Sequence, residues 1–436
     1  MSYVQYHHSY SLPRHILKLK PNSLGFLLVL LVSQSHVLVR SEFAEINTKH
    51  IQSKQDVANG GEDILIQHDD IKSQSGLQTL KVGATKGIPP LDTNGYIIFC
   101  PCMGRFGNQM EQMIGGLSFA KMLNRTLILP PLREDLSTFT TFTDWFQVDP
   151  ILEFHRVIKG EDFMQHYGES YWPAGRRNGY CRDYVVDNNR CRMKYGLPHS
   201  AFWDYFNVDF DGVISFDLID EVDLSLESEV KLLRKQWIER FPSSEHPVLA
   251  MYNVPGSFPS LPGNKFIQKY IKWNSSLLAE ADKVKQMLFG GEKYLGIHLR
   301  VGEDWDRVCQ TAVGVSSMYF ASPQCKSSNH GRIFQGMCYP SVQEILDLTK
   351  EAIMTFDLRH LYIASDDNPY KEDFKETLHA LNVTVHHYNP TSPHLDLIML
   401  GEADYFIGNC ISTFTSFIKR ERDARGRLST FWGYPV

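Results

Sequence analysis

The segment Gly104-Arg105-Phe106-Gly107-Asn108-Gln109 places a cation, two glycines and two amides between a short apolar run and a helical pattern. Backbone N–H groups at the start of a helix attract anions, and an arginine beside them adds charge and a fork of hydrogen-bond donors. The segment therefore predicts a phosphate-binding turn with Asn108 at the helix entrance. An alternative of equal weight is a tight turn in which Asn108 caps the helix.

A second candidate site is His298-Leu299-Arg300-Val301-Gly302-Glu303-Asp304-Trp305, which follows a later apolar run. His298 and Arg300 are two residues apart at a strand end, so their side chains point the same way. Arginine can grip a phosphate through two N–H groups, and Asp304 could orient it or bind sugar hydroxyls. The alternative is an internal Arg–Asp pair. We favour function, because a buried strand rarely ends in so many polar groups.

Hydroxyl groups precede a charged helix in a third segment, residues 408–422, which contains Ser412, Thr413 and Phe414. Hydroxyls and backbone amides at a helix N-terminus again suit phosphate oxygens, although simple capping would also explain Ser412 and Thr413. For most of the charges between Lys419 and Arg422 we expect a solvent-exposed helix face.

Strands that alternate with helices must position these segments. Short apolar runs predict buried strands at Tyr96–Phe99, Tyr294–Arg300, His360–Ala364, Val383–Val385 and Tyr405–Gly408. The spacing of the apolar residues predicts a helix with a buried stripe formed by Met110, Met113, Ile114, Leu117 and Ala120. Ser341-Val342-Gln343-Glu344 predicts a capping box that opens another helix. The alternation predicts an α/β fold with parallel sheets, which bind ligands beyond the carboxyl ends of their strands.

The 436 residues suggest two domains with additional sequence. Basic residues precede the apolar run Leu24–Val32, so residues 1–40 are predicted to be a signal peptide or signal anchor. The polar composition of residues 41–91 predicts a flexible stem or linker. We place an N-terminal Rossmann-like domain at 92–250 and a C-terminal Rossmann-like, donor-binding domain at 251–436.

Composition excludes some partners and indicates a compartment. The net charge of −6 argues against a nucleic-acid binder, which usually carries a basic excess. The eight cysteines are an even number, and sequons for N-glycosylation occur at Asn124, Asn274 and Asn382. Together with the signal segment, these features indicate the secretory pathway.

Two Asp-x-Asp triplets, Asp209-Phe210-Asp211 and Asp304-Trp305-Asp306, could hold Mg²⁺ or Mn²⁺ against phosphates. Arginines are available for the same task, so Mn²⁺ is not expected to be essential and no cofactor is required. Cys100-Pro101-Cys102 has no companion pair at zinc-ligand spacing, and a disulfide fits an oxidising compartment better. We therefore predict no metal site.

The three segments, in this order and spacing, resemble the GDP-fucose protein O-fucosyltransferase family, above all its members that act on EGF-like repeats. The resemblance covers roughly Asn94 to Gly433. It implies a GT-B-like architecture, in which two Rossmann-like domains face each other across a cleft. It also implies an inverting transfer of fucose from GDP-β-L-fucose to Ser or Thr hydroxyls of folded EGF-like repeats, such as those of Notch-type receptors. The donor-binding residues that it implies are Arg105, Phe106, Gly107, Asn108, His298, Leu299, Arg300, Asp304, Asp396, Ser412, Thr413 and Phe414.

We assign the catalytic roles to Arg300, which would stabilise the departing diphosphate, and to Asn108, which would position the acceptor hydroxyl. The disulfides implied by the resemblance are Cys100–Cys102, Cys181–Cys191, Cys309–Cys338 and Cys325–Cys410. A monomer in the lumen of the endoplasmic reticulum is expected. The family usually ends in a retrieval signal, but this chain ends in Gly433-Tyr434-Pro435-Val436, which leaves retention open. The rival functions are transfer to thrombospondin-type repeats and a non-catalytic chaperone that binds EGF-like repeats.

Overall fold

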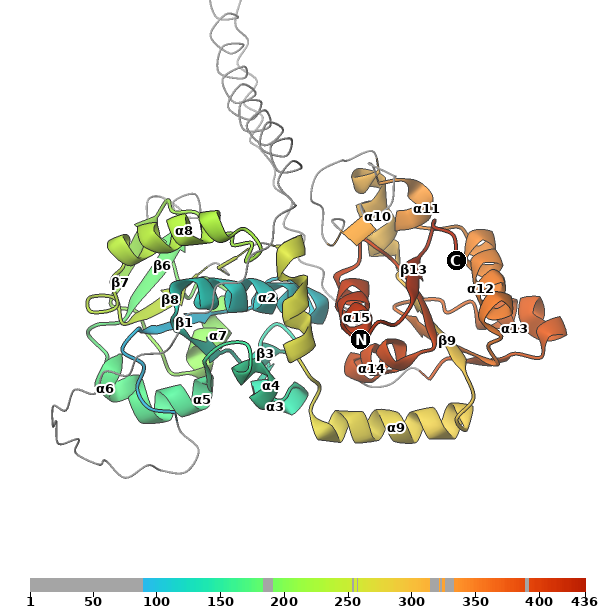
Figure 1. The fold of residues 1–436 in the computed structure, drawn as a ribbon, viewed down its shortest axis with the longest axis horizontal. Helices are drawn as coiled ribbons and strands as arrows, with labels where there is room; N and C mark the ends of the chain where they lie inside the picture. The colour runs from blue at the N-terminus through green and yellow to red at the C-terminus, as the bar shows by residue number, and fades with distance from the viewer. Residues whose placement is uncertain are drawn as a thin grey trace, which may run out of the picture. The chain divides into compact units, whose positions relative to one another are not determined.

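The structure, a computed structural model, describes residues 89–182, 191–252, 255–256, 258–313, 321, 324–325, 333–388 and 392–436 (Figure 1). All of them belong to one compact unit, Gly83–Val436. The predicted signal segment, and the predicted stem up to residue 88, lie outside the described residues. No helix within the described ranges is both long and apolar enough to pass through a bilayer.

The N-terminal lobe is built on a six-stranded sheet with the order β5-β2-β1-β8-β6-β7, in which every pair of neighbouring strands is parallel. Its strands are β1 (Tyr96–Phe99), β2 (Thr126–Leu129), β5 (Val157–Lys159), β6 (Asn178–Arg182), β7 (Gly212–Phe216) and β8 (Val248–Met251). Alternate residues of β1 enter different cores, because Ile97 and Phe99 belong to one hydrophobic cluster and Tyr96 and Ile98 to another. The sheet is thus covered on both faces, which explains why β1 is apolar throughout.

The C-terminal lobe repeats this plan with a five-stranded parallel sheet of order β11-β10-β9-β12-β13. Its strands are β9 (Tyr294–Leu299), β10 (His360–Ser365), β11 (Thr384–His386), β12 (Tyr405–Gly408) and β13 (Ser429–Phe431). The predicted α/β architecture with parallel sheets is therefore confirmed. A small antiparallel pair, β3 (Leu132–Arg133) and β4 (Phe139–Thr140), follows β2.

Helices connect the strands in both lobes. In the N-terminal lobe they are α2 (Phe106–Leu123), α3 (Phe142–Trp145), α4 (Asp149–Leu152), α5 (Gly160–Phe163), η1 (Met164–Gly168), α6 (Glu169–Tyr171), α7 (His199–Tyr205) and α8 (Glu227–Arg240). From the connection onward they are η3 (Pro262–Tyr270), α9 (Ser275–Phe289), α10 (Glu303–Ala312), α11 (Gln335–Cys338), α12 (Val342–Phe356), α13 (Lys371–Leu378), η5 (His379–Leu381), α14 (Pro393–Glu402) and α15 (Thr413–Ala424). The capping box predicted at Ser341 opens α12.

The chain leaves the first sheet at Met251, the end of β8, and enters the second at Tyr294, the start of β9. The predicted domain boundary at 250/251 falls one residue before this connection begins. The limits of the domains as independent folding units remain a prediction.

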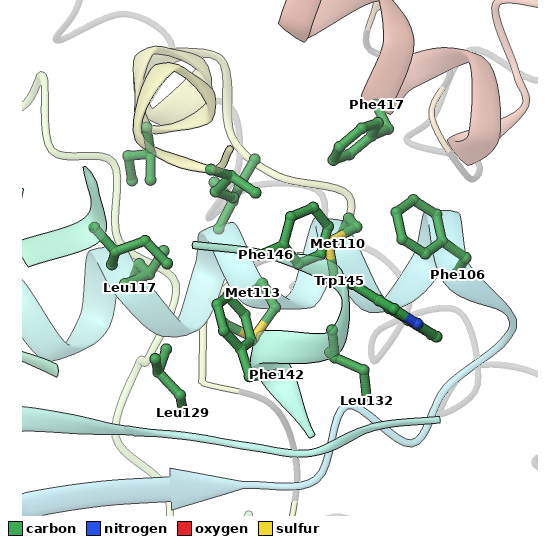
Figure 2. Close-up of a cluster of buried hydrophobic side chains, with 14 of the residues drawn as sticks. Phe106, Met110, Met113, Leu117, Leu129, Leu132, Phe142, Trp145, Phe146 and Phe417 are labelled. Carbon is green, nitrogen blue, oxygen red and sulfur yellow. The ribbon is translucent and has the colours of Figure 1, made fainter. Parts of the chain in front are cut away.

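Helix α2 is buried almost all round, whereas the spacing of its apolar residues predicted one buried stripe. Of its residues, only Asn108 and Lys121 are not buried. Figure 2 shows why α2 is buried on several sides at one end, because there Phe106 lies near Trp145 and near Phe417 of α15. A single hydrophobic cluster thus contains side chains from both lobes, including Phe106 and Phe417. Gly116 lets the helix lie close to β1, because a Cβ there would collide with the ring of Phe99.

The charged stretch of α15 corrects one expectation, since most of it is not a solvent-exposed helix face. Arg420, Glu421 and Arg422 retain 4%, 4% and 0% of their surface. Arg420 pairs with the buried carboxylate of Glu111 in α2. Arg422 donates hydrogen bonds to the backbone carbonyls of Leu400, Gly401, Ala403, Asp404 and Leu428. These partners lie outside α15, so the pattern of α15 itself could not reveal them.

Candidate active site

The N-termini of α2 and α15, one from each lobe, meet in the structure. Neither helix is capped by a side chain at its N-terminal cap residue, Arg105 in α2 and Ser412 in α15. Uncapped helix N-termini carry unpaired N–H groups and a partial positive charge, which together favour an anion. Two segments predicted separately to bind phosphate are therefore brought together.

Gly107 permits this approach. A Cβ at position 107 would lie 2.6 Å from the backbone nitrogen of Phe414 and 2.7 Å from Oγ1 of Thr413. No side chain fits in that space, so the contact between the two helix ends depends on glycine. Gly104 has a different constraint, because its φ is +67° and a Cβ would overlap the side chain of Asn108.

Asn108 is held by a hydrogen bond between the lobes. The hydroxyl of Thr413 donates to Oδ1 of Asn108 over 2.6 Å. With its oxygen occupied, the carboxamide keeps its two Nδ2 hydrogens for another acceptor. Asn108 occupies the third position of α2 rather than the cap, so the alternative in which it caps the helix is not what the structure contains.

Arg300 is fixed by two carboxylates. Its Nη1 and Nη2 donate to Oδ1 and Oδ2 of Asp304 at 3.2 and 2.7 Å, and Nη1 also pairs with Asp366. The guanidinium lies over the ring of Trp305, 4.9 Å from its centroid. Of the five N–H groups of an arginine, these contacts use three. The other two, including Nε–H, can serve a phosphate, and the carboxylates set the plane in which they point.

Asp366 is a site residue that the sequence prediction missed. Its Oδ1 accepts a hydrogen bond from the backbone N–H of Val301 at 2.8 Å, while its Oδ2 faces Arg300. The position of Asp366 at the end of a predicted strand could have revealed it. Asp366 directly follows β10, and β10 pairs with β9, the strand that leads into Arg300. The carboxyl ends of adjacent parallel strands lie at the same sheet edge.

His298 is a buried, neutral imidazole. Burial, assisted by the charge of Arg300, lowers the pKa of His298 to about 3. Its Nδ1 lies 2.7 Å from Oγ1 of Thr415, and that oxygen already accepts a hydrogen bond from the N–H of Asn409. A hydroxyl oxygen can accept two hydrogen bonds, so the bond between Thr415 and Nδ1 can run in either direction, and Nε2 is correspondingly a donor or an acceptor. In either tautomer His298 is uncharged and cannot supply positive charge at neutral pH.

Asp396 lies in the first turn of α14. Tyr362 of β10 donates its hydroxyl to Oδ1 of Asp396 over 2.6 Å. Burial raises the pKa of Asp396 to about 6, although the hydrogen bond from Tyr362 opposes the shift. A carboxyl group with this pKa changes its charge just below neutral pH. Tyr362 is the second residue of the candidate site that the sequence prediction missed.

The remaining predicted donor residues differ in what they can offer. Arg105 is exposed, and in the described part of the chain its side chain has no hydrogen bond or ion pair. The side chains of Phe106 and Leu299 are buried in hydrophobic clusters, so only their backbones could face a ligand. Ser412 is 5% exposed, and the ring of Phe414 lies 4.7 Å from that of His298.

Four disulfides brace these segments, in the pairs that the resemblance implied: Cys100–Cys102, Cys181–Cys191, Cys309–Cys338 and Cys325–Cys410. The first lies in the loop just before α2, and the last joins residue 325 to the loop just before α15. Each thereby restrains the chain that enters one of the two helix N-termini.

The three sequons present their asparagines differently. Asn382 is exposed, and Asn124 is partly exposed. Asn274 caps α9 through Oδ1, while its Nδ2 donates to the carbonyls of Thr143 and Asp144. A glycan on Nδ2 of Asn274 would disturb those hydrogen bonds. Occupancy remains a prediction for all three.

The residues that the structure describes contain one grouping of three potential metal ligands, Cys100, Cys102 and His199. Its two sulfur atoms are joined in a disulfide, which removes them as thiolate ligands. In the Asp-x-Asp triplets, Asp304 is paired with Arg300 and Asp209 with Lys194. The metal requirement stays a prediction.

Comparison with known proteins gives consistent matches. The profile of a family described as GDP-fucose protein O-fucosyltransferase matches residues 96–425. GDP-fucose protein O-fucosyltransferase 1 of Caenorhabditis elegans is 36% identical over 358 residues, which cover 78% of this chain and 91% of that protein.

Solved structures agree with the sequence matches. The crystal structure of POFUT1 in its apo form is 35% identical, with a TM-score of 0.73, and the match covers 80% of this chain and all of POFUT1 (100%). The complex of POFUT1 with GDP-fucose gives the same identity (35%) and TM-score (0.73), and covers 79% of this chain and 99% of POFUT1. The two parallel-sheet lobes are thus GT-B-like. The chain is a fucosyltransferase that belongs to the GDP-fucose protein O-fucosyltransferase family.

Proposed function

We propose that this enzyme transfers fucose from GDP-β-L-fucose, with inversion, to Ser or Thr hydroxyls of folded EGF-like repeats. Membership of the family and the similarity to POFUT1 bound to GDP-fucose support the donor. The single observation that carries the proposal is the meeting of the uncapped N-termini of α2 and α15. The first turn of α15 contacts His298, which is two residues before the fixed guanidinium of Arg300. That arrangement suits a diphosphate that becomes more negative as the sugar departs.

In the proposed mechanism Arg300 acts on the leaving group. The bond between the anomeric carbon and the diphosphate oxygen breaks through an oxocarbenium-like state, and negative charge collects on GDP. The two N–H groups of Arg300 that Asp304 and Asp366 leave available donate to phosphate oxygens. The helix N-termini add N–H dipoles that need no reorganisation during the reaction.

The acceptor hydroxyl attacks the opposite face of the anomeric carbon. We assign its positioning to Nδ2 of Asn108, because Thr413 occupies the other end of that carboxamide. The carboxylates beside Arg300 are held in ion pairs and are poor bases. The hydroxyl proton therefore leaves late and passes to a phosphate oxygen of the departing GDP.

The acceptor is expected to be a folded repeat rather than a linear peptide, because a disulfide-stapled repeat has already met the entropic cost of ordering. The test compares a refolded EGF-like repeat with its reduced, alkylated form at equal concentration. Transfer should occur to the folded form, and equal transfer to both forms would contradict the proposal.

The same assay separates the rival functions. It offers GDP-fucose and other nucleotide sugars with folded EGF-like and thrombospondin-type repeats. Transfer only to the thrombospondin-type repeat would move the assignment to that acceptor class. Binding of EGF-like repeats without transfer or donor hydrolysis would indicate a chaperone.

We place the enzyme, as a monomer, in the lumen of the endoplasmic reticulum. The four disulfides require an oxidising compartment, and EGF-like repeats of secreted and cell-surface proteins such as Notch-type receptors pass through it.

Donor affinity should depend on the charge of Asp396, which we propose binds the donor as a carboxylate. Because burial holds its pKa at about 6, protonation below that pH should raise KM for GDP-fucose. The diphosphate diester of the donor does not itself titrate there. Asp396→Asn should have a raised KM that no longer changes between pH 5 and 7.5, and an unchanged wild-type KM across that range would exclude the carboxylate.

The raised pKa also has a consequence for folding. The pKa of Asp396 is 3.8 in its ordinary state and about 6 in the fold. At a pH between these two values, the native state therefore keeps the proton on Asp396 more tightly than the unfolded chain does. The contribution of Asp396 therefore favours the fold at low pH and weakens as pH rises through that window.

Activity should survive an excess of EDTA, because Arg300 and the helix N-termini can neutralise the diphosphate. We expect the rate to stay within about two-fold of the untreated enzyme. Complete loss that Mn²⁺ restores would instead support a metal at one of the two Asp-x-Asp triplets, Asp209-Phe210-Asp211 or Asp304-Trp305-Asp306.

A further inference from the structure

Arg133 differs from the other buried arginines of the described chain. Arg125, Arg177, Arg420 and Arg422 all donate to backbone carbonyls or to a carboxylate. Arg133 is only 8% exposed, yet its Nε is sealed from solvent without a hydrogen-bond partner. Within the residues that the structure describes, its guanidinium has no ion pair. Nε is the nitrogen of this guanidinium that is sealed in this way. A buried N–H donor of a cation that lacks a partner is costly, which indicates that a ligand completes it.

The fold places Arg133 beside the candidate active site. Arg133 ends β3, which follows the carboxyl end of β2, and β2 pairs in parallel with β1. The loop after β1 leads into α2, so Arg133 lies at the sheet edge where α2 begins. Gln109 ties the two together, because its Nε2 donates to the carbonyl of Arg133 at 2.8 Å and its Oε1 accepts from the N–H of Arg133 at 2.7 Å. Asn108 is the preceding residue.

Burial, rather than a nearby charge, dominates the electrostatics of Arg133. It lowers the pKa of Arg133, while the carboxylate of Asp135 raises it and the cation Arg105 lowers it to a smaller extent. The carboxylate of Asp135 is exposed and accepts hydrogen bonds from Ser137 and Thr138 in its own turn. His199, whose pKa responds to the charge of Arg133, is partly buried, and its Nδ1 is sealed from solvent without a hydrogen-bond partner among the described residues. Burial and the charge of Arg133 lower the pKa of His199 to about 4, so His199 adds no charge.

We infer that Arg133 is a substrate-anchoring residue, whose guanidinium binds an oxyanion of a substrate at the N-terminal side of the site. The oxyanion is either a phosphate oxygen of the nucleotide or a carboxylate of the acceptor protein. The inference rests on the proposed function, because it takes the two substrates from there. Arg105 and Arg133 together form a cationic pair on this side of the site, separate from Arg300 on the other lobe.

The test uses the full chain with Arg133→Gln and Arg133→Lys. It measures GDP binding by calorimetry, and it measures kcat and the KM values for GDP-fucose and for a folded EGF-like repeat. Loss of a charged hydrogen bond should weaken one of these affinities by about ten-fold or more with kcat little changed. A rise in KM for GDP-fucose with weaker GDP binding identifies a phosphate, and a rise in KM for the acceptor alone identifies a carboxylate.

Arg133→Lys should recover part of the loss, because it keeps the charge but not the fork. The matched control is Arg156→Gln, which removes an exposed arginine paired with Asp92 in the same lobe and should change neither KM. If Arg133→Gln folds and leaves both KM values and GDP affinity within about two-fold of wild type, the inference is overturned.

If Arg133→Gln does not fold, the inference is tested with Arg133→Lys only. An unchanged set of constants in that variant would then overturn the inference. A wild-type chain that neither binds GDP nor transfers fucose would instead refute the proposed function, so the two failures can be told apart.

Discussion

Replacing Arg300 by Ala is expected to lower kcat by about a hundred-fold to a thousand-fold, the effect of removing one preorganised donor from a developing anion. The diphosphate gains charge as the glycosidic bond breaks, so the guanidinium contributes more in the transition state than in the ground state. KM for GDP-fucose should change much less than kcat. Steady-state kinetics with GDP-fucose and a folded EGF-like repeat measure both parameters.

Arg300→Lys should fail almost as badly, because an ammonium cannot face Asp304 and Asp366 and still present two N–H groups to phosphate. A matched control is Arg359→Ala, which breaks an exposed arginine–aspartate pair at 2.9 Å with Asp357 and should leave kcat unchanged. Near-wild-type turnover in Arg300→Ala would refute the assigned mechanism.

Arg420→Met is expected to lower the free energy of unfolding by about 3–5 kcal/mol, as is typical when one partner of a buried ion pair is removed. The side chains of Arg420 and Glu111 are 4% and 1% exposed. Burial alone would raise the pKa of Glu111, but the charge of Arg420 and hydrogen bonds from Ser260 outweigh it and hold the pKa below its ordinary value. Without Arg420, an ionised carboxylate would remain buried against α15.

The neighbouring residue provides the control. Lys419 pairs with Asp423 on the same helix, where the side chains are 23% and 50% exposed, and Lys419→Met should cost less than about 1 kcal/mol. Urea unfolding of both variants measures the difference. Adding Glu111→Gln to Arg420→Met should cost less than the sum of the single changes, because the two residues interact. Equal destabilisation by Lys419→Met and Arg420→Met would contradict the ion-pair explanation.

We also expect this pair to affect function. It joins α2 and α15 within about two turns of the N-termini that carry Asn108 and Thr413. Arg420→Met should therefore weaken transfer even below its unfolding temperature, since the two helix ends would no longer be held at a fixed separation.

Local pattern was sufficient for several elements that lead into the candidate site. The predicted strand at Tyr96–Phe99 has the bounds of β1, and Tyr405–Gly408 has those of β12. The capping box at Ser341 is present. These features depend on residues close together in the chain, where apolar runs, helical spacing and capping chemistry are visible in the sequence itself.

The charges of α15 show where local pattern fails. Lys419 is on the helix surface as expected, but Arg420 and Arg422 are buried by Glu111 and by the backbone carbonyls that end α14. An arginine has the same local signature whether water or a distant carboxylate surrounds it. Its burial is decided by which element packs against that face of the helix.

The sequence by itself determined the parallel α/β plan, the polar residues at the strand ends and, through the resemblance of its motifs, the family. Only the tertiary structure brought Asn108 to Thr413, Arg300 to Asp366 and Glu111 to Arg420. Only the tertiary structure, too, buried the Nε of Arg133 without a hydrogen-bond partner in the described part of the chain. The physical reason is the range of the interactions. Secondary structure follows from neighbours within a few residues, whereas these side chains meet across tens to hundreds of residues, where packing of whole elements decides which polar groups are paired and which remain for a ligand.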